Sequence, residues 1–274
     1  PDNVTIFGES AGGVSTCALM ATDLAEGLFD RAIMESGNCL VEGSMKRPDK
    51  ETANKEAAHD QGRQYAEALD CDGADDVAAC MREKSAQAII DAKNIGVGVG
   101  SQQNQAETFE PVIDGHVFTQ SIAESIEDDS ALDVAFVIGF NENEGTVFVP
   151  QAWRAATKQQ YQNLVRTAFP NIGDDVLEQY PADDYDKPWL AWSAIVTDIA
   201  FVCPARRAAR DHAANGHDTY MYAFTHVRSS WERLGIGAFH GAEISFVFHD
   251  DRPGWNDDDR ALGTAMSSWW AQFG

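Results

Sequence analysis

Residues 8–12 read Gly-Glu-Ser-Ala-Gly and contain a serine whose surroundings are typical of a nucleophile. A β-rich stretch at residues 4–7 precedes this G-x-S-x-G motif, and small residues typical of a helix follow it through about Ala21. On a strained strand-to-helix turn, the flanking glycines let neighbouring backbone pass without a Cβ clash. The backbone N–H of Ala11 would donate to a developing oxyanion. The motif therefore predicts nucleophilic catalysis by Ser10.

A serine hydroxyl needs a neighbouring base, and the base needs an acid to orient it. In folds with this turn, the acid and then the histidine follow the serine along the chain. Residues 141–145 (NENEG) carry carboxylates directly after a continuous apolar run at residues 134–140. That run is typical of a buried strand, and open α/β sheets place their chemistry at strand carboxyl ends. This segment is therefore the candidate source of the acid.

Seven histidines compete for the role of the base. Those in polar helical or loop stretches are interpreted as surface residues: His59, His212 and His217. Those beside a turn, a strand end or acidic residues are interpreted as structural: His116, His226 and His249. His240 differs, because it stands between glycines in residues 237–244 (GAFHGAEI), after an expected strand at residues 220–225.

Strand and helix patterns alternate along the chain, which indicates an α/β fold with a parallel sheet. A further strand is expected at residues 31–37. Helices are expected at residues 50–69, 85–93, 152–169 and 189–214, with Ser85 as an N-cap and a break before Pro204. The glycine-rich residues 96–101 lack the spacing of a dinucleotide-binding loop and are interpreted as a flexible loop.

Composition excludes several classes of function. The 274 residues carry 44 acidic and 20 basic side chains, a net charge of −24, which disfavours binding to nucleic acid or anionic lipid. No apolar run approaches the ~18 residues of a membrane span. The acidic excess fits a saline habitat or an ordinary secreted protein. The cluster Asp257–Asp259 is expected in a solvated loop, no Cys/His spacing fits zinc, and neither metal nor cofactor is expected.

An ordered series of motifs resembles the type-B carboxylesterase family, which includes cholinesterases and large fungal lipases. The matching segments are residues 8–13 (GESAGG), 27–33 (GLFDRAI), 35–37 (ESG) and 109–115 (FEPVIDG), with Asp198, Phe201 and Pro204 at the spacing D-x-x-F-x-x-P. The resemblance covers nearly the whole chain. It implies an α/β-hydrolase fold with a mostly parallel central sheet, helical insertions at about residues 45–108 and 151–215, and serine ester hydrolysis.

The resemblance also assigns roles to single residues. The family pattern after the apolar strand ends in Glu-Gly, which carries over to Glu144 and not to Glu142. The H-G-x-E-I pattern makes His240 the general base and then the general acid. Glu9 and Glu243 occupy family-like positions beside the nucleophile and the base, where they would tune the imidazole or pair within the core.

The chain has five cysteines, of which two are candidates for a disulfide. Cys71 and Cys80 are near enough in sequence to staple a short loop, and the family has a disulfide at a similar place. This pair implies an oxidising compartment, hence secretion or the periplasm. Cys17, Cys39 and Cys203 form an odd set, for which a pair between Cys39 and Cys203 or buried free thiols are both open.

The two ends of the chain suggest an internal piece of a longer protein. Residue 1 is Pro at the edge of an expected strand, and the chain stops inside an expected helix after Trp269 and Trp270. In the family, a glycine-rich loop upstream of the serine supplies the second oxyanion donor. The 274 residues alone are therefore expected to be inactive.

The substrate is expected to be a small-molecule ester. An ungapped comparison puts Gln105 and Glu107 where cholinesterases carry aromatic acyl-pocket residues, which favours a broad carboxylesterase. The alternatives are a lipase for longer acyl chains, a non-catalytic adhesion module of the same family and a serine peptidase. The sequence leaves the oligomeric state open.

Overall fold

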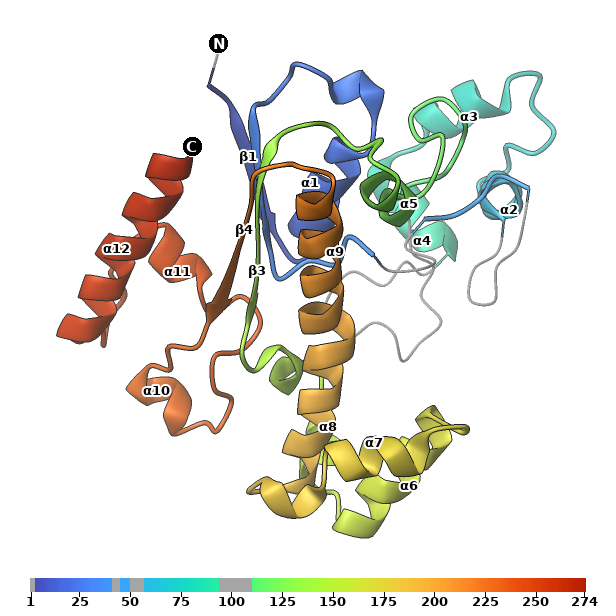
Figure 1. Ribbon diagram of the computed structural model, residues 1–274. Helices are drawn as coiled ribbons and strands as arrows, with labels where there is room; N and C mark the ends of the chain where they lie inside the picture. The colour runs from blue at the N-terminus through green and yellow to red at the C-terminus, as the bar shows by residue number, and fades with distance from the viewer. Residues whose placement is uncertain (1–2, 41–44, 50–56, 94–109) are drawn as a thin grey trace. The chain divides into compact units, whose positions relative to one another are not determined.

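The computed structural model describes residues 3–40, 45–49, 57–93 and 110–274 (Figure 1). The chain divides into two compact units, one formed by Pro1–Val41 with Ile122–Gly274 and the other by Glu42–Ser121. The first unit contains the β-sheet and every residue for which a catalytic role is expected. Residues 96–101, Gln105 and Glu107 lie outside the described residues, as does the start of the helix expected at 50–69.

Four parallel strands form the sheet of the first unit, in the order β1-β2-β3-β4. Their bounds are Thr5–Glu9 for β1, Arg31–Glu35 for β2, Ala135–Asn141 for β3 and Thr219–Phe224 for β4. Glu9 pairs with Glu35, and Glu35 pairs with Gly139. All four carboxyl ends therefore lie along one edge of the sheet, and the expected α/β fold with a parallel sheet is confirmed.

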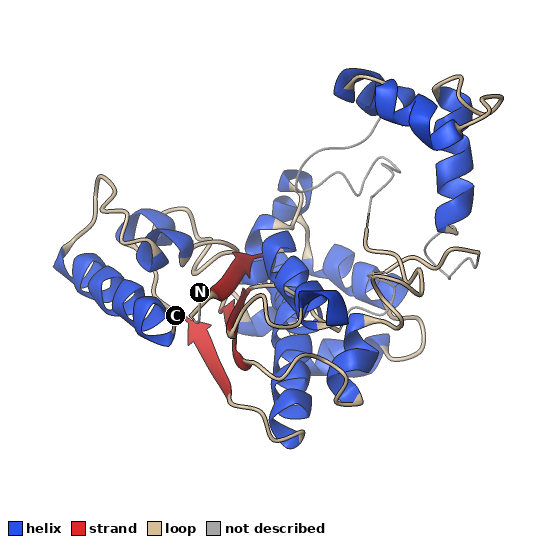
Figure 2. Ribbon diagram, turned by 90° about the horizontal axis from the view of Figure 1, so that it is seen from above, coloured by secondary structure: helices blue, strands red, loops and turns tan. Residues whose placement is uncertain are grey.

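Helices cover both faces of this sheet (Figures 1 and 2). One face carries α1 (Ala11–Met20), α5 (Ile122–Glu127) and α9 (Cys203–Ala214). The other carries α11 (Ile244–Val247) and α12 (Asp257–Phe273). The Trp270 ring of α12 packs edge-on against Tyr222 of β4, with ring centroids 5.2 Å apart. Short elements join these layers: η1 (Asp23–Ala25), η3 (Glu144–Val147) and α10 (Ser229–Glu232).

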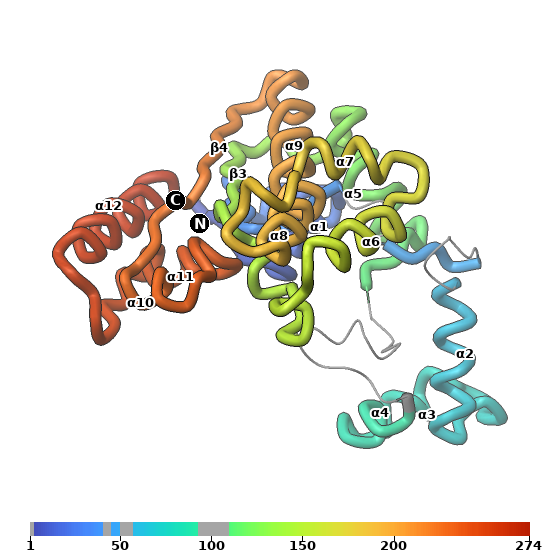
Figure 3. The backbone as a smooth tube through the Cα atoms, turned by 90° about the horizontal axis from the view of Figure 1, so that it is seen from below, coloured from blue at the N-terminus to red at the C-terminus, as the bar shows by residue number. Residues whose placement is uncertain are grey.

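A helical group follows η3 and ends with the helix that returns to the sheet. It comprises η4 (Gln151–Ala155), α6 (Lys158–Ala168), α7 (Gly173–Gln179), η5 (Ala182–Asp184) and α8 (Pro188–Thr197). Helices α6 and α7 lie beside α8 (Figure 3). Their shared core contains Tyr161, Val165, Ala182, Ala191 and Ile195. This group begins where the second helical insertion, at about residues 151–215, is expected, and it ends at Thr197.

The break expected before Pro204 is wrong. Between α8 and α9 the chain forms a π-helical segment, η6 (Asp198–Val202), so that Pro188–Ala214 runs as one helix. Pro204 lies in the first turn of α9 and is tolerated because the widened turn precedes it. In the described part of the chain, this helix is long and apolar enough to cross a membrane by length and composition, a test that core helices of soluble proteins also pass.

The described part of the second unit contains three helices. Its helices are α2 (Ala58–Ala68), α3 (Val77–Glu83) and α4 (Ala86–Lys93). Ser85 caps α4 as expected, because its Oγ accepts a hydrogen bond from the N–H of Ala88 at 3.1 Å. The expected disulfide between Cys71 and Cys80 is present, and Cys71 is fully buried in the core of this unit.

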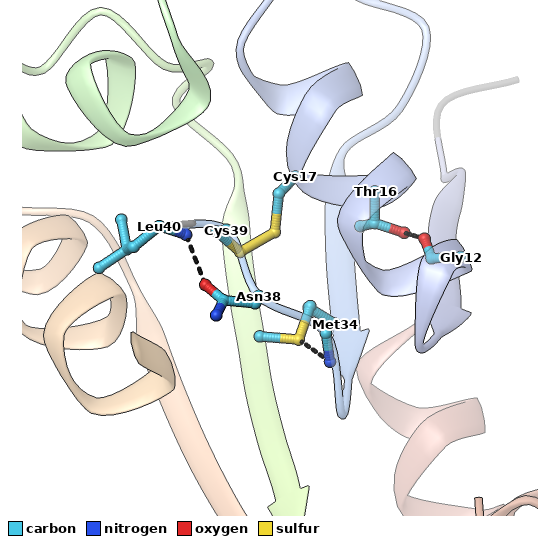
Figure 4. Close-up of a disulfide and its surroundings, with 8 residues drawn as sticks. Gly12, Thr16, Cys17, Met34, Asn38, Cys39 and Leu40 are labelled. Carbon is cyan, nitrogen blue, oxygen red and sulfur yellow. Dashed lines mark hydrogen bonds between the residues drawn. A yellow bond between two sulfur atoms is a disulfide. The ribbon is translucent and has the colours of Figure 1, made fainter. Parts of the chain in front are cut away.

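The pairing considered between Cys39 and Cys203 is wrong. Cys39 is joined to Cys17, with their Cα atoms 5.6 Å apart (Figure 4). Cys203 is a free, exposed thiol. Cys17 lies on α1, which packs on β2, and Cys39 follows β2 by four residues. Packing of α1 on the sheet therefore brings these two sulfur atoms together.

Two other expectations also fail. His212 is not a surface residue, because α9 packs on the sheet and buries it; its Nδ1 lies 2.8 Å from Thr219 Oγ1. Burial, together with the charge of His217, lowers the pKa of His212 to about 4. Residues 257–259 are not in a loop but form the first turn of α12, where Asp259 completes a capping box and lies 2.6 Å from His226 Nε2.

Glu35 ties the sheet to α12. Its side chain is 3% exposed, and its Oε1 accepts a hydrogen bond from Trp270 Nε1 at 2.5 Å. Burial raises the pKa of Glu35 to about 7, against the lowering effect of the Trp270 bond and with a further rise from the charge of Glu9. The folded protein therefore holds a proton on Glu35 at pH values where the unfolded chain has lost it.

We predict that this carboxyl makes folding stability depend on pH. Between pH 4.5 and about 7 the folded state binds the Glu35 proton and the unfolded state does not, so the contribution of Glu35 to stability falls as pH rises. The total loss is about 3 kcal/mol. Glu35→Gln should flatten this part of the profile in urea unfolding of the complete protein. Glu26→Gln, at an exposed position, is the control and should leave the slope unchanged.

The cysteine pairing also predicts a labelling pattern. Alkylation of the unreduced complete protein should modify Cys203, because its thiol is free and exposed. Mass spectrometry of the digest should recover linked peptides that join Cys17 with Cys39 and Cys71 with Cys80. A peptide linked through Cys203 would contradict this pairing.

Candidate active site

Ser10 occupies the sharp turn between β1 and α1. Its backbone has a positive φ of 58° with ψ of −117°, a conformation that costs energy for a residue with a Cβ atom. Two backbone bonds fix the turn: Ser10 N–H donates to Glu35 O at 2.9 Å, and Ser10 O accepts from Val14 N–H at 3.0 Å. The turn therefore holds the hydroxyl at the carboxyl edge of the sheet.

The glycines of the motif have different roles from one another. A Cβ on Gly8 would lie 2.5 Å from the backbone carbonyl of Gly12, so only glycine fits there. A Cβ on Gly12 would meet nothing within 4 Å, so the steric need expected at Gly12 is absent from the described structure. Gly13 takes that role instead, since its Cβ would lie 3.0 Å from Glu35 O.

Glu144 lies three residues beyond the end of β3, in the first turn of η3, and is fully buried. Its Oε1 accepts the backbone N–H of Asn141 at 2.7 Å. Its Oε2 lies 2.6 Å from His240 Nδ1. Glu142, by contrast, is exposed to solvent. Of the two carboxylates after the strand, Glu144 is thus the one that faces the imidazole.

The close approach of η3 and α8 explains why residue 145, directly after Glu144, is a glycine. A Cβ at Gly145 would lie 2.1 Å from the carbonyl oxygen of Ser193, so η3 and α8 approach too closely for any side chain. The N–H of Gly145 donates to Thr197 Oγ1 at 2.9 Å. The start of η3, and Glu144 with it, is therefore anchored on α8.

His240 lies in the loop between α10 and α11, and its two ring nitrogens face different partners. Besides the contact of Nδ1 with Glu144, Nε2 lies 2.7 Å from Ser10 Oγ. Asn141 and Asn143 hold the loop in place: Asn141 Nδ2 donates to Phe239 O, and Ala238 N–H donates to Asn143 Oδ1, both at 2.9 Å. Three side chains widely separated in sequence thus form one chain of hydrogen bonds.

The electrostatic surroundings favour the protonated imidazole. Burial lowers the pKa of His240, but the hydrogen bond and charge of Glu144 raise it, as do the charges of Glu9 and Glu243. The net effect is a pKa above the ordinary value of 6.5. A base of this kind accepts a proton readily at neutral pH.

Glu9 and Glu243 take different places around the imidazole. Glu9 Oε1 lies 3.3 Å from His240 Nε2, without the geometry of a hydrogen bond, and burial raises the pKa of Glu9. Glu243 is fully buried and accepts hydrogen bonds from Asn141 Nδ2 and from Ser36 Oγ. Burial raises its pKa to about 8. Glu9 therefore acts on the imidazole directly, whereas Glu243 is bonded within the core.

Several residues of the site were missed by sequence reasoning. Ser36 and Asn141 hold Glu243, and the rings of Phe148 and Phe201 face the imidazole. Asn141 is the first residue of the NENEG segment, and Phe201 is part of the D-x-x-F-x-x-P spacing. Both therefore lie in motifs that the sequence analysis identified, but that analysis gave neither residue a role. Among the described residues, no group of three or more His, Cys, Asp or Glu side chains is arranged to hold a metal ion.

Ala11 is the first residue of α1, directly after the serine. The first N–H groups of a helix have no partner inside it, and the helix dipole favours negative charge at this end. The backbone N–H of Ala11 is thus next to the Ser10 hydroxyl in the place where an oxyanion donor is expected.

Comparison with known proteins shows what the chain is similar to. The chain is 28% identical over its whole length to a pyrethroid hydrolase, Ces2e, of Rattus norvegicus, and 27% identical to a cocaine esterase of Homo sapiens. It is 30% identical, over 90% of its length, to the crystal protein of Dictyostelium discoideum. The chain spans about half the length of these relatives, from 45% to 49%. The model of the Carboxylesterase family matches residues 1–274, and the chain therefore belongs to the carboxylesterase family, whose fold is that of the α/β-hydrolases.

Proposed function

We propose that the protein hydrolyses carboxylic esters through an acyl-enzyme, with Ser10 as nucleophile, His240 as base and Glu144 as the acid that orients the base. The observation that carries this proposal is the continuous chain from Glu144 Oε2 to His240 Nδ1 at 2.6 Å and from His240 Nε2 to Ser10 Oγ at 2.7 Å. Membership of the carboxylesterase family supports the choice of ester substrates.

The reaction starts with attack of Ser10 Oγ on the ester carbonyl while His240 Nε2 takes the hydroxyl proton. The carbonyl oxygen becomes an oxyanion, to which the N–H of Ala11 donates. His240 then gives the proton to the departing alcohol, and the acyl group stays on Ser10. In the second half, His240 takes a proton from water, which attacks the acyl carbonyl and releases the acid.

Glu144 serves this cycle by fixing one tautomer of the imidazole. Because its Oε2 accepts the Nδ1–H, the lone pair of Nε2 points at the serine. When His240 becomes charged, the buried carboxylate stabilises the imidazolium at short range. The Asn141 N–H satisfies the other carboxylate oxygen and keeps Glu144 from turning away.

The substrate class proposed is that of small carboxylic esters, as in a broad carboxylesterase. The names of the relatives, a pyrethroid hydrolase and a cocaine esterase, are consistent with such a range. The two disulfides support export to an oxidising compartment. No cofactor takes part in the proposed reaction.

The first prediction from this proposal concerns the triad. Ser10→Ala should lower kcat for 4-nitrophenyl acetate by about 10⁶, because the nucleophile is lost. Glu144→Gln should lower kcat by about 10⁴, because an amide at that position favours the wrong tautomer of His240. Hydrolysis by the purified complete protein is followed through release of nitrophenolate.

Glu142→Gln is the matched control for Glu144→Gln. It makes the same chemical change two residues away, at an exposed carboxylate. We expect its kcat to stay within twofold of the parent. Equal losses in the two variants would refute the assignment of Glu144, and ester turnover that survives Ser10→Ala would refute the proposed nucleophile.

The second prediction concerns pH. The reaction needs the neutral imidazole, so kcat/KM should rise with pH through the pKa of His240 in the free protein, which lies above 6.5. The negative charge of Glu9 raises this pKa. Glu9→Gln should therefore move the midpoint of the acidic limb to lower pH, whereas Glu142→Gln should leave it in place. A limb that does not move in Glu9→Gln would show that Glu9 carries no charge beside His240.

A further inference from the structure

Two phenylalanine rings pack against the imidazole of His240. The ring centroids of Phe148 and Phe201 each lie 5.0 Å from that of His240. The two phenylalanines also stack on each other, with centroids 5.7 Å apart and planes 20° from parallel. Phe148 directly follows η3, whereas Phe201 comes from the π-helical segment η6. Rings from two separate elements therefore restrict the movement of one imidazole.

Pro204 explains the irregular helix that carries Phe201. In an α-helix the N–H of residue 204 would bond to the carbonyl of Ala200, but proline has no N–H. Asn38 supplies the missing donor, because its Nδ2 donates to Ala200 O at 2.8 Å. The carbonyl that proline leaves unpaired is thus satisfied from outside the helix, one residue before Phe201.

Neighbouring contacts hold the Asn38 side chain in place. Asn38 Oδ1 accepts the N–H of Leu40 at 2.9 Å, which sets the side chain on its own turn. The neighbouring Cys39 is bonded to Cys17 of α1 (Figure 4). At the start of the π-helical segment, Asp198 accepts the hydroxyl of Tyr180 at 2.5 Å. The start of η6, at Asp198, and its middle, at Ala200, are therefore anchored.

The hydrogen bonds of His240 do not by themselves hold its ring. Both bonds are made by ring nitrogens in the plane of the ring, so they resist tilting of that plane less than packing against the two ring faces does. In the acyl-enzyme the proposed mechanism also removes the serine hydroxyl as a partner of Nε2. Packing against the ring faces then has to keep Nε2 aimed at the incoming water.

We propose that Phe201 is a positioning residue for His240, set in place by the π-helical segment and by the bond from Asn38 to Ala200. Phe201 touches the base and not the reacting atoms, and together with Phe148 it keeps the imidazole in line between Glu144 and Ser10. This role rests on the proposed function, because it concerns the same base. In this proposal η6 contributes to the position of the catalytic base as well as to the fold.

The test compares Phe201→Leu with Phe169→Leu in the complete protein. Phe169 is a partly buried ring that follows α6 and lies against Trp192, with ring centroids 6.4 Å apart. It packs on the core shared by α6, α7 and α8, and Phe201 is not among the residues of that core. Active sites are counted by the burst of nitrophenolate, so that kcat refers to folded protein alone. We expect Phe201→Leu to lower kcat per site by 10- to 100-fold, with KM within threefold, since small misplacements of a catalytic group are costly.

A second variant, Phe201→Met, is the control for a folding defect in Phe201→Leu. It keeps most of the volume but has no flat ring, so it should lose kcat to a similar extent. Phe169→Leu should keep kcat within twofold even where its melting temperature falls. A value of kcat per site within twofold of the parent in either Phe201 variant would overturn the proposal.

Proton NMR of the same variants separates this proposal from the proposed function. The proton between His240 Nδ1 and Glu144 Oε2, which lie 2.6 Å apart, should give a low-field signal that is absent in His240→Gln. We expect the signal to broaden in Phe201→Leu and to stay sharp in Phe169→Leu, whether or not the protein hydrolyses an ester. An unchanged signal in Phe201→Leu overturns the role of Phe201, whereas absent ester turnover in the parent overturns the proposed function.

Discussion

The short contact between Glu144 and His240 is the constraint on which the rest of the site depends. Glu144 is fully buried, and a buried carboxylate is costly unless each oxygen has a partner. Both oxygens have one, Asn141 N–H on Oε1 and His240 Nδ1 on Oε2. The imidazole is therefore required by the burial of the acid as well as by the serine. Stability and the proposed chemistry thus depend on the same hydrogen bond.

This contact in turn requires that separate elements approach one another closely. The carboxyl ends of β1 and β3 must lie near each other, which the parallel pairing through β2 ensures. η3 must lie directly on α8, and the absence of a side chain at Gly145 permits that approach. The positive φ of Gly237, whose Cβ would lie 2.0 Å from Asn143 Oδ1, lets the histidine loop close over the strand end. Each glycine thus sits where the backbone of one element meets another.

The features that the sequence predicts best are those decided by a few neighbouring residues. The turn around Ser10, the strand before Glu144 and the cap at Ser85 each follow from a local pattern, and the structure has each of them. The disulfide of Cys17, the burial of His212 and the course of the helix through Pro204 depend instead on what packs against them. For Pro204 the deciding partner is Asn38, far away in the chain. No local pattern contains that information.

Burial affects the ionisation of the acidic side chains around His240. Glu9, Glu35 and Glu243 all lie at strand ends or beside the histidine loop, and burial raises the pKa of each. If all of them were ionised together with Glu144, their mutual repulsion would act in a medium that screens it weakly. Burial raises the pKa of Glu243 to about 8 and that of Glu35 to about 7, which favours the neutral form of both carboxyls. Burial thus favours the neutral form of the two carboxyls bonded within the core, Glu35 and Glu243, whereas the carboxyls of Glu9 and Glu144 are those that lie against the imidazole. The carboxyls in contact with the base therefore act on it at the shortest distance, and the deeper acids serve mainly as hydrogen-bonded parts of the core.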